Sequence, residues 1–207
     1  AFAFGQVIYG PLSDRYGRRP VLIGSFALYV AACGACAAAP SVNGLILARA
    51  FQALGAAGPI ILARTVVRDL YEGHRAAREM ARMGTIMGVV PAIAPALGGL
   101  LQTLFGWRAS FFASFVGAAV LAFAVVLLLP ETLRQRSDAS LSPLGILRNF
   151  GFIARNPAFR LNAAIAALGY AGLFAFISGA SFVLQGNYGL SPLQMGLSFC
   201  LVVFGYV

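Results

Sequence analysis

Long uncharged runs constrain the fold of this chain more than any other feature. No charged residue lies within Pro20–Ala39, Met83–Trp107 or Ala109–Pro130, and none occurs from Leu161 to Val207. An α-helix needs roughly 20 consecutive apolar residues to cross a bilayer. Because the runs lack the alternating pattern of a barrel strand, they predict helices. We therefore expect an all-α, polytopic membrane protein.

The charge composition supports this class and disfavours others. Only 10% of the 207 residues are charged, whereas a soluble domain usually has about 25%. The net charge of +9 reflects fifteen arginines and no lysine. A basic balance can indicate nucleic-acid binding, but these arginines lie mostly in short connections between apolar runs. That distribution is typical of membrane topology, so we expect a lipid bilayer and no nucleic acid as partner.

The apolar runs and their borders predict seven helical segments. They cover Ala1–Leu12, Pro20–Ala39, Gly44–Val67, Met80–Phe105, Ala109–Leu129, Leu161–Gln185 and a last segment that begins at Ser191-Pro192. The first segment is too short to span a bilayer and the last one stops within a helix, so we expect a piece of a longer protein.

Most of the arginines lie in alternate connections, at 10–20, 64–82 and 130–160. The positive-inside rule places these connections in the cytoplasm. The intervening connections, Pro40–Asn43 and Gly186–Leu190, are then expected outside the cell.

The connection from Pro130 to Arg160 is long for packed helices. Ser142-Pro143 can start a helix in it, and Asn156-Pro157 can end that helix. An apolar stripe follows, with two arginines roughly opposite: Ile146, Leu147, Phe150, Ile153 and Ala154 against Arg148 and Arg155. This pattern favours a helix on the inner membrane surface, with a disordered linker as the alternative. The connection divides the chain into 1–129, 130–160 and 161–207.

A compact charged motif follows the first segment. The positions Gly10, Leu12, Asp14, Arg15, Gly17, Arg18 and Arg19 fill the pattern G-x-L-x-D-R-x-G-R-R. The motif resembles the signature loop between helices 2 and 3 of the major facilitator superfamily. The resemblance implies a cytoplasmic latch between the two halves of a transporter, in which Asp14 can pair with arginine or meet a helix N-terminus. The alternative is a solvated turn that only sets the topology.

The same resemblance implies a major facilitator fold, of which the chain covers part of helix 2 to part of helix 8. About seven of twelve transmembrane helices would then be present. Residues 1–129 would form most of the N-terminal six-helix bundle, and 161–207 would start the C-terminal bundle.

Arg49 and Gln52, within the third segment, resemble the helix-4 motif R-x-x-Q-G-x-G of drug/proton antiporters, although Ala53 replaces a glycine. A charged side chain inside a span is costly and tends to face a wet cavity. The resemblance implies a role in proton coupling. The alternative is that Arg49 extends to the nearby outer interface.

The fourth segment carries Pro91, Pro95, Gly98 and Gly99, and its end resembles the helix-5 antiporter motif G-P-x-x-G-G. Ala94 and Val90 replace two of the motif's glycines. The resemblance favours export over uptake, although packing of small residues explains the glycines almost as well.

Several stretches, FGQVIYGPLSDRYGRRP and YGLSPLQMG among them, resemble the bicyclomycin and chloramphenicol/florfenicol resistance branch, Bcr/CflA. In the sixth segment Tyr170, Phe174 and Ser178 follow one another at one helical turn. They are candidates for a largely apolar substrate cavity, and lipid-facing aromatic residues are the alternative.

The sequence offers no catalytic constellation and no metal set, since His74 is its one histidine. Cys33 and Cys36 have the spacing of a redox pair, but they lie in an alanine- and glycine-rich span, which favours close packing. We therefore expect no enzyme and no cofactor; a membrane-embedded enzyme is the remote alternative.

The resemblance as a whole implies a proton-coupled multidrug efflux transporter of the bacterial inner membrane, driven by the proton gradient and monomeric. A symporter or facilitator for a sugar or amino acid is the alternative. The six carboxylates lie in or beside cytoplasmic connections: Asp14, Asp69, Glu72, Glu79, Glu131 and Asp138. We therefore expect the proton carrier outside these residues, in helix 1 by resemblance, with Arg49 as its fixed-charge partner.

Overall fold

The computed structural model describes residues 1–133 and 143–206. Their elements are α1 (Phe2–Tyr16), α2 (Arg18–Ala38), α3 (Val42–Leu70), α4 (Gly73–Phe105), α5 (Arg108–Leu128), α6 (Pro143–Ala154), α7 (Pro157–Phe182), the π-helical turn η1 (Val183–Asn187) and α8 (Pro192–Tyr206). The described residues contain no β-strand, and the all-α prediction is confirmed for them. Five of their helices, α2, α3, α4, α5 and α7 with η1, are long and apolar enough to cross a membrane.

The motif predicted as a loop at 10–20 is almost entirely helical. Asp14 and Arg15 lie in the last turn of α1, and Arg18 and Arg19 open α2, so Gly17 is the one residue between the helices. Gly17 has a φ of 108°, which a side chain makes unfavourable. The short turn predicted within 10–20 is therefore confirmed, with narrower bounds than predicted, because Gly17 alone reverses the chain.

The arginine-rich connection predicted at 64–82 is also shorter in the structure, where only Tyr71 and Glu72 lie between α3 and α4. Residues 75–82 consist of alanine, arginine, glutamate and methionine, which have high helix propensity, so α4 begins well before the apolar run. Its 33 residues make it about 50 Å long, longer than the roughly 30 Å hydrocarbon core of a bilayer.

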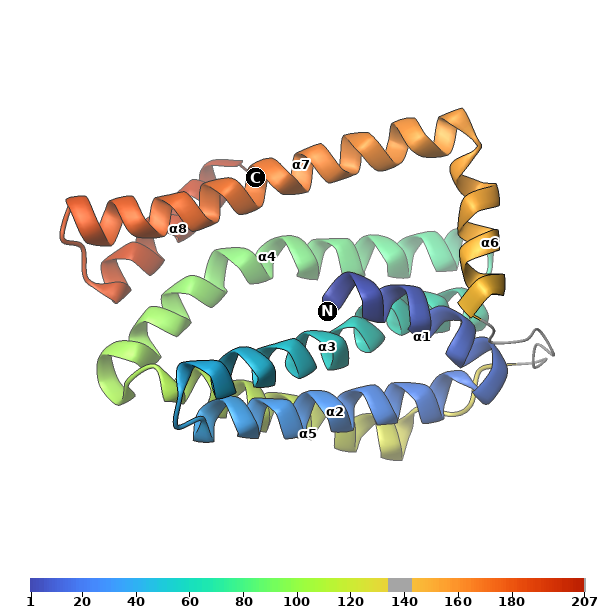
Figure 1. Ribbon diagram of the computed structural model, residues 1–207, viewed down its shortest axis with the longest axis horizontal. Coiled ribbons are helices and arrows are strands. Elements are labelled where there is room, and N and C mark those ends of the chain that lie inside the picture. Colours follow the sequence, from blue (N-terminus) through green and yellow to red (C-terminus); the bar gives the residue numbers. More distant parts are fainter. Residues whose placement is uncertain (134–142, 207) are drawn as a thin grey trace.

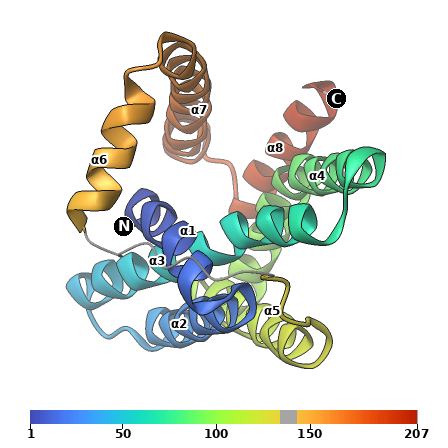
Figure 2. The same cartoon turned by 90° about the vertical axis from the view of Figure 1, so that its right-hand side faces the viewer.

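The helices form two contact groups. α2 packs against α3 and α5, α1 packs against α3, and α4 packs against α8. Figure 1 shows the long helices running roughly side by side, with α6 across their ends next to the turn between α1 and α2. In Figure 2 α7 stands apart from the group formed by α1, α2, α3 and α5, whereas α4, which pairs with α8, also contacts α3 and α5.

Close packing in the first group depends on small residues. A Cβ on Gly55 would lie 2.5 Å from the backbone nitrogen of Tyr29, and one on Gly58 would overlap the side chain of Ser25. α2 and α3 therefore approach at backbone distance, as small residues permit in membrane bundles. In α2 and α3 a third of the most apolar stretch is buried, whereas in α7 none of it is.

The described residues include most of the residues predicted to mark the ends of α6. An α-helix begins at Pro143, as predicted, and the Asn156 side chain accepts hydrogen bonds from the N–H groups of Ala158 and Phe159 at the start of α7. Ser142 lies outside the described residues, as do the side chains of Ile146 and Leu147.

Candidate functional site

The charged residues of the first motif form a network around the Arg18 side chain, which is only 10% exposed. Its Nη1 donates to Asp14 Oδ1 at 2.5 Å and to Ser13 Oγ at 2.6 Å, and its Nε donates to Asp69 Oδ2 at 3.1 Å. Asp69 comes from the end of α3. We call Asp14, Arg18, Asp69, Glu131 and Thr132 the Arg18 cluster.

Glu131 joins this cluster from the segment after α5. Its carboxylate accepts hydrogen bonds from the N–H groups of Arg18 and Arg19 at 2.9 and 3.2 Å and from those of Thr132 and Leu133 at 3.0 Å each. Burial by itself raises the pKa of Glu131, but these four N–H groups outweigh it and hold the pKa below its ordinary value. The carboxylate thereby occupies the N-terminus of α2, where negative charge is favourable.

Gly17 is required by this contact as well as by its φ. A Cβ at Gly17 would overlap the Glu131 carboxylate. Thr132 completes the connection, since its Oγ1 donates to Asp69 Oδ2 at 3.4 Å. Three connections far apart in the sequence, α1–α2, the end of α3 and the segment after α5, therefore meet at one point.

The remaining motif residues have different surroundings. Leu12 packs on the apolar core around Leu22 and Leu62. The Arg15 guanidinium lies 5.7 Å from the centre of the Tyr16 ring, and Arg19 Nη2 donates to the Val126 carbonyl at 2.7 Å. A Cβ on Gly10 would meet no atom within 4 Å. Sequence reasoning missed Glu131 and Thr132; their position directly after an apolar run was the available signal.

Arg49 is part of a second polar group, at an exposed position on α3 beside the buried Gln52. Its Nη1 donates to Gln52 Oε1 at 2.7 Å, and its guanidinium lies 5.6 Å from the centre of the Phe111 ring. Gln52 is buried at 5% exposure, and its Nε2 donates to Cys33 Sγ at 3.0 Å. Among the described residues no carboxylate pairs with Arg49, whose side chain is exposed.

Cys33 and Cys36 are free thiols with no exposed surface. Cys33 contacts the Gln52 amide, and Cys36 Sγ lies 4.0 Å from Gln52 Oε1. The two thiols therefore pack against the Gln52 side chain, whose Oε1 accepts the hydrogen bond from Arg49. The described residues contain no group of histidine, cysteine and carboxylate side chains that could hold a metal ion.

The glycines of the fourth segment lie at a helix crossing. A Cβ on Gly99 would overlap the carbonyl of Pro192 in α8, and a Cβ on Gly196 in α8 would overlap the carbonyl of Pro95. Gly98 has no such neighbour within 4 Å. α4 and α8, predicted to belong to different bundles, therefore touch through backbone at Gly99 and Gly196.

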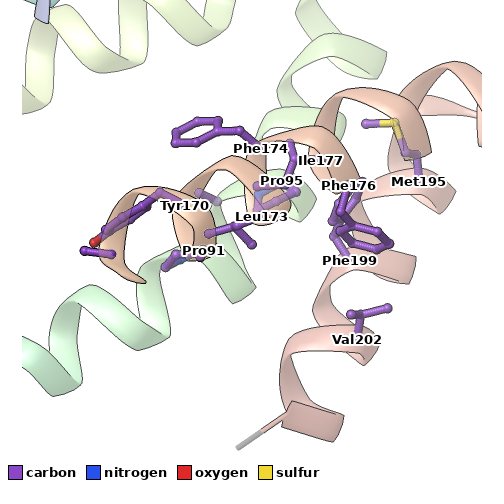
Figure 3. Close-up of a pocket in the computed structure, with 13 residues that line it drawn as sticks. Pro91, Pro95, Tyr170, Leu173, Phe174, Phe176, Ile177, Met195, Phe199 and Val202 are labelled. Carbon is purple, nitrogen blue, oxygen red and sulfur yellow. The ribbon is translucent and has the colours of Figure 1, made fainter. Parts of the chain in front are cut away.

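A cavity of about 890 Å³ lies beside this crossing, between α4, α7 and α8. Figure 3 shows Pro91 and Pro95 from α4 together with Tyr170 and Phe174 from α7 around it. Phe176, Met195 and Phe199 extend the lining, and Tyr170 carries its one hydroxyl group. The structure thus brings two sequence-predicted groups together. Ser178 is exposed and is not among the lining residues.

The described carboxylates lie near helix ends. Asp14 and Asp69 belong to the last turns of α1 and α3, Glu72 precedes α4, and Glu131 follows α5. Glu79, in the early part of α4, accepts from Arg82 Nη1 at 2.6 Å. Asp138 lies outside the described residues.

The chain matches the family model of the Major Facilitator Superfamily over residues 1–207. The resemblance predicted from the charged motif is thereby confirmed. Multidrug resistance protein D of Escherichia coli is 32% identical over 98% of this chain, and a chloramphenicol resistance protein of Pseudomonas aeruginosa is 33% identical over 98%. A bicyclomycin resistance protein homolog of Haemophilus influenzae is 27% identical over 96%. These names agree with the predicted Bcr/CflA resemblance.

The chain spans about half the length of these relatives: 50%, 48% and 50%, respectively. A solved structure, the human organic anion transporter MFSD10, matches with a TM-score of 0.70 at 21% identity, over 96% of this chain and 50% of that one. At this identity the likeness shows the fold alone.

Proposed function

Because this chain belongs to the Major Facilitator Superfamily, a family of transporters and not of enzymes, we propose that its full-length protein exports amphiphilic drugs in exchange for protons. The names of the relatives support drug export. We place the protein in a bacterial inner membrane as a monomer that needs no cofactor, with the proton gradient as its energy source.

The cavity between α4, α7 and α8 is the observation that supports a drug-like substrate. Drug sites are mostly apolar, with few polar groups that fix orientation. A sugar or an amino acid needs many hydrogen-bonding partners, and a site that lacks them leaves its polar groups unpaired. Of the cavity's lining residues, only Tyr170 offers a hydroxyl. The lining therefore favours an amphiphilic, largely apolar substrate over the alternative of a small polar metabolite.

For the mechanism, we infer alternating access by two bundles, of which residues 1–129 and 161–207 are parts and 130–160 the connection. In this scheme the bundles rock about the α4–α8 crossing, as transporter halves do around a site between them. The Arg18 cluster keeps the cytoplasmic ends of α1, α2, α3 and α5 in one body and presents Asp14, which is 48% exposed, to the opposite bundle.

Proton coupling requires a group that changes charge within the membrane, and arginine keeps its proton. Arg49 serves as a fixed positive charge that favours the ionised form of a facing carboxylate. The described carboxylates lie near helix ends, so the carrier would come from a helix outside this chain. Gln52, held by Cys33 at 3.0 Å, orients the Arg49 guanidinium.

The test uses the full-length protein in proteoliposomes under an imposed pH gradient. A fluorescent amphiphilic cation is compared with labelled sugars and amino acids. We expect gradient-driven movement of the cation alone. Movement of a metabolite without movement of the cation would establish the alternative and refute drug export.

A matched pair of variants on α7 links transport to the cavity. Phe174 lines it, whereas Phe182, on the same helix, is 82% exposed and does not. Phe174→Ala removes apolar contact with the substrate and should lower the transport rate about fivefold. Phe182→Ala should leave the rate unchanged, and an equal loss in both variants would remove the cavity from the proposal.

The membrane orientation has its own test, in a cysteine-free background with single cysteines. An impermeant thiol reagent should label Asn187→Cys from outside the cell and Glu72→Cys only from the cytoplasmic side. Labelling of Asn187→Cys from the cytoplasm alone would invert the topology.

A further inference from the structure

α6 has large apolar side chains that no other helix covers. Phe150, Phe152 and Ile153 are 45%, 76% and 43% exposed. Among the described helices, α6 makes substantial contact only with α7, its neighbour in sequence. A twelve-residue helix that leaves three such side chains open needs another apolar environment to cover them.

The charges around α6 are one-sided. Arg148, Arg155 and Arg160 are exposed, and among the described residues none of them forms an ion pair with a carboxylate. After Asp138 the sequence contains no aspartate or glutamate as far as Val207. Arg148 lies within α6, and Arg155 directly follows the last residue of α6, Ala154. These three arginines therefore have no negatively charged partner within the described chain.

The position of α6 suggests where the counter-charge comes from. Figure 1 shows α6 lying across the long helices at the end that also holds the α1–α2 turn. α7 begins at Pro157, three residues after the end of α6, and is long and apolar enough to span a membrane. A helix that leads directly into such a span, and runs across its direction, lies along the plane where headgroups meet acyl chains.

We propose that α6 and the start of α7 form a binding surface for anionic phospholipids. Phe150 and Ile153 enter the boundary between headgroups and acyl chains, and Arg148, Arg155 and Arg160 bind lipid phosphates. Amphipathic helices with this combination bind through apolar burial together with attraction to anionic lipid. Each arginine near an anionic surface contributes about a fivefold preference. The site lies outside the proposed transport route and does not depend on the substrate.

The experiment measures which lipids contact α6 in the full-length protein. Phe150→Trp provides a fluorescent reporter after the other tryptophans are changed to phenylalanine. The protein is reconstituted into phosphatidylcholine vesicles that contain a minority of phosphatidylglycerol, with bromine on the chains of either lipid. Bromine quenches tryptophan only at contact, so quenching relative to mole fraction gives the preference. We expect at least about fivefold preference for phosphatidylglycerol.

A matched pair of variants locates the preference. Arg148→Gln with Arg155→Gln should lower it severalfold, and Arg160 should retain part of it. Arg75→Gln with Arg78→Gln removes the same charge from exposed positions early in α4 and should leave it unchanged. Because no step involves transport, the result is independent of whether the protein exports drugs.

Three results would overturn the proposal. Quenching by neither brominated lipid would mean that α6 is covered by protein or water. Quenching in proportion to mole fraction would remove the headgroup preference. An equal loss of preference in both double variants would assign it to the overall field of the protein instead of α6.

Discussion

Arg18 and Arg49 belong to the same group of helices and have opposite surroundings. Arg18 is buried near a helix end, and its guanidinium meets two carboxylates and a hydroxyl. Arg49 lies within α3, where its described partners are the neutral Gln52 amide and the Phe111 ring. One positive charge is balanced inside the described chain, and the other is not.

This difference in pairing indicates a structural role for Arg18 and a functional role for Arg49. A buried charge that is paired on several sides holds elements together, and its loss leaves the partners unpaired. A charge without a fixed counter-ion is available to a mobile one, such as a carboxylate that gains and loses a proton. Substitution should therefore damage folding at Arg18 and coupling at Arg49.

Arg18→Gln should have the largest effect on stability. It leaves Asp69, 24% exposed, without its positive partner, and we expect a loss of about 3 kcal/mol in the free energy of unfolding. Arg15→Gln is the matched control, since Arg15 is exposed in the same turn and should change stability by less than about 0.5 kcal/mol. Denaturant unfolding of the full-length protein measures both. Equal stability of the two variants would contradict a structural role for the Arg18 cluster.

Arg49→Gln should abolish proton-driven export and cost no more than about 1 kcal/mol of stability, because one described hydrogen bond is lost. Proton release on drug addition to proteoliposomes provides the measurement. Arg49→Lys keeps the charge and should keep part of the coupling. Normal coupling in Arg49→Gln would show that Arg49 has only a packing role, and the contrast with Arg18 would fail.

Asp14→Asn should have a smaller effect, because Asp14 is half-exposed and Arg18 keeps Asp69. Loss of this ion pair should cost less than about 1 kcal/mol, yet transport should fall if Asp14 contacts the other bundle. Transport rate at equal membrane level is the measurement, with Asp14→Glu as the control that keeps the charge. Unchanged transport would reduce the motif to a turn that sets topology.

The smallest effect concerns Glu131 and pH. Its pKa is lower in the folded protein than its ordinary value, so its contribution is complete above about pH 5. The contribution is lost as the pH falls through the lowered pKa. Because Glu131 is exposed, the contribution should remain below about 1 kcal/mol. Unfolding at a series of acidic pH values should show a shallower decline in Glu131→Gln, and parallel curves would exclude the contribution.

Helix ends that depend on neighbouring residues could be predicted from the sequence, whereas helix ends that depend on distant contacts could not. The Asn156-Pro157 signal correctly predicted the end of α6, but the predicted start of the next helix, Leu161, was four residues late. α7 begins at Pro157, because the Asn156 side-chain cap and the first-turn proline act within a few residues. The turn predicted within 10–20 was too long, because Gly17 alone reverses the chain where Glu131 occupies the N-terminus of α2. That contact joins residues more than a hundred positions apart, and no local pattern contains it.

The all-α membrane class, the superfamily and the charged motif follow from the sequence alone, because long uncharged runs and fixed motif spacing are local properties. The packing of the helices was needed to show that Asp69 and Glu131 complete the Arg18 cluster. It was also needed to show that Gln52 links Arg49 to Cys33, and that Pro91 and Pro95 share a cavity with Tyr170 and Phe174. These groupings depend on which helices pack together, and side chains from distant segments meet only after that packing is set.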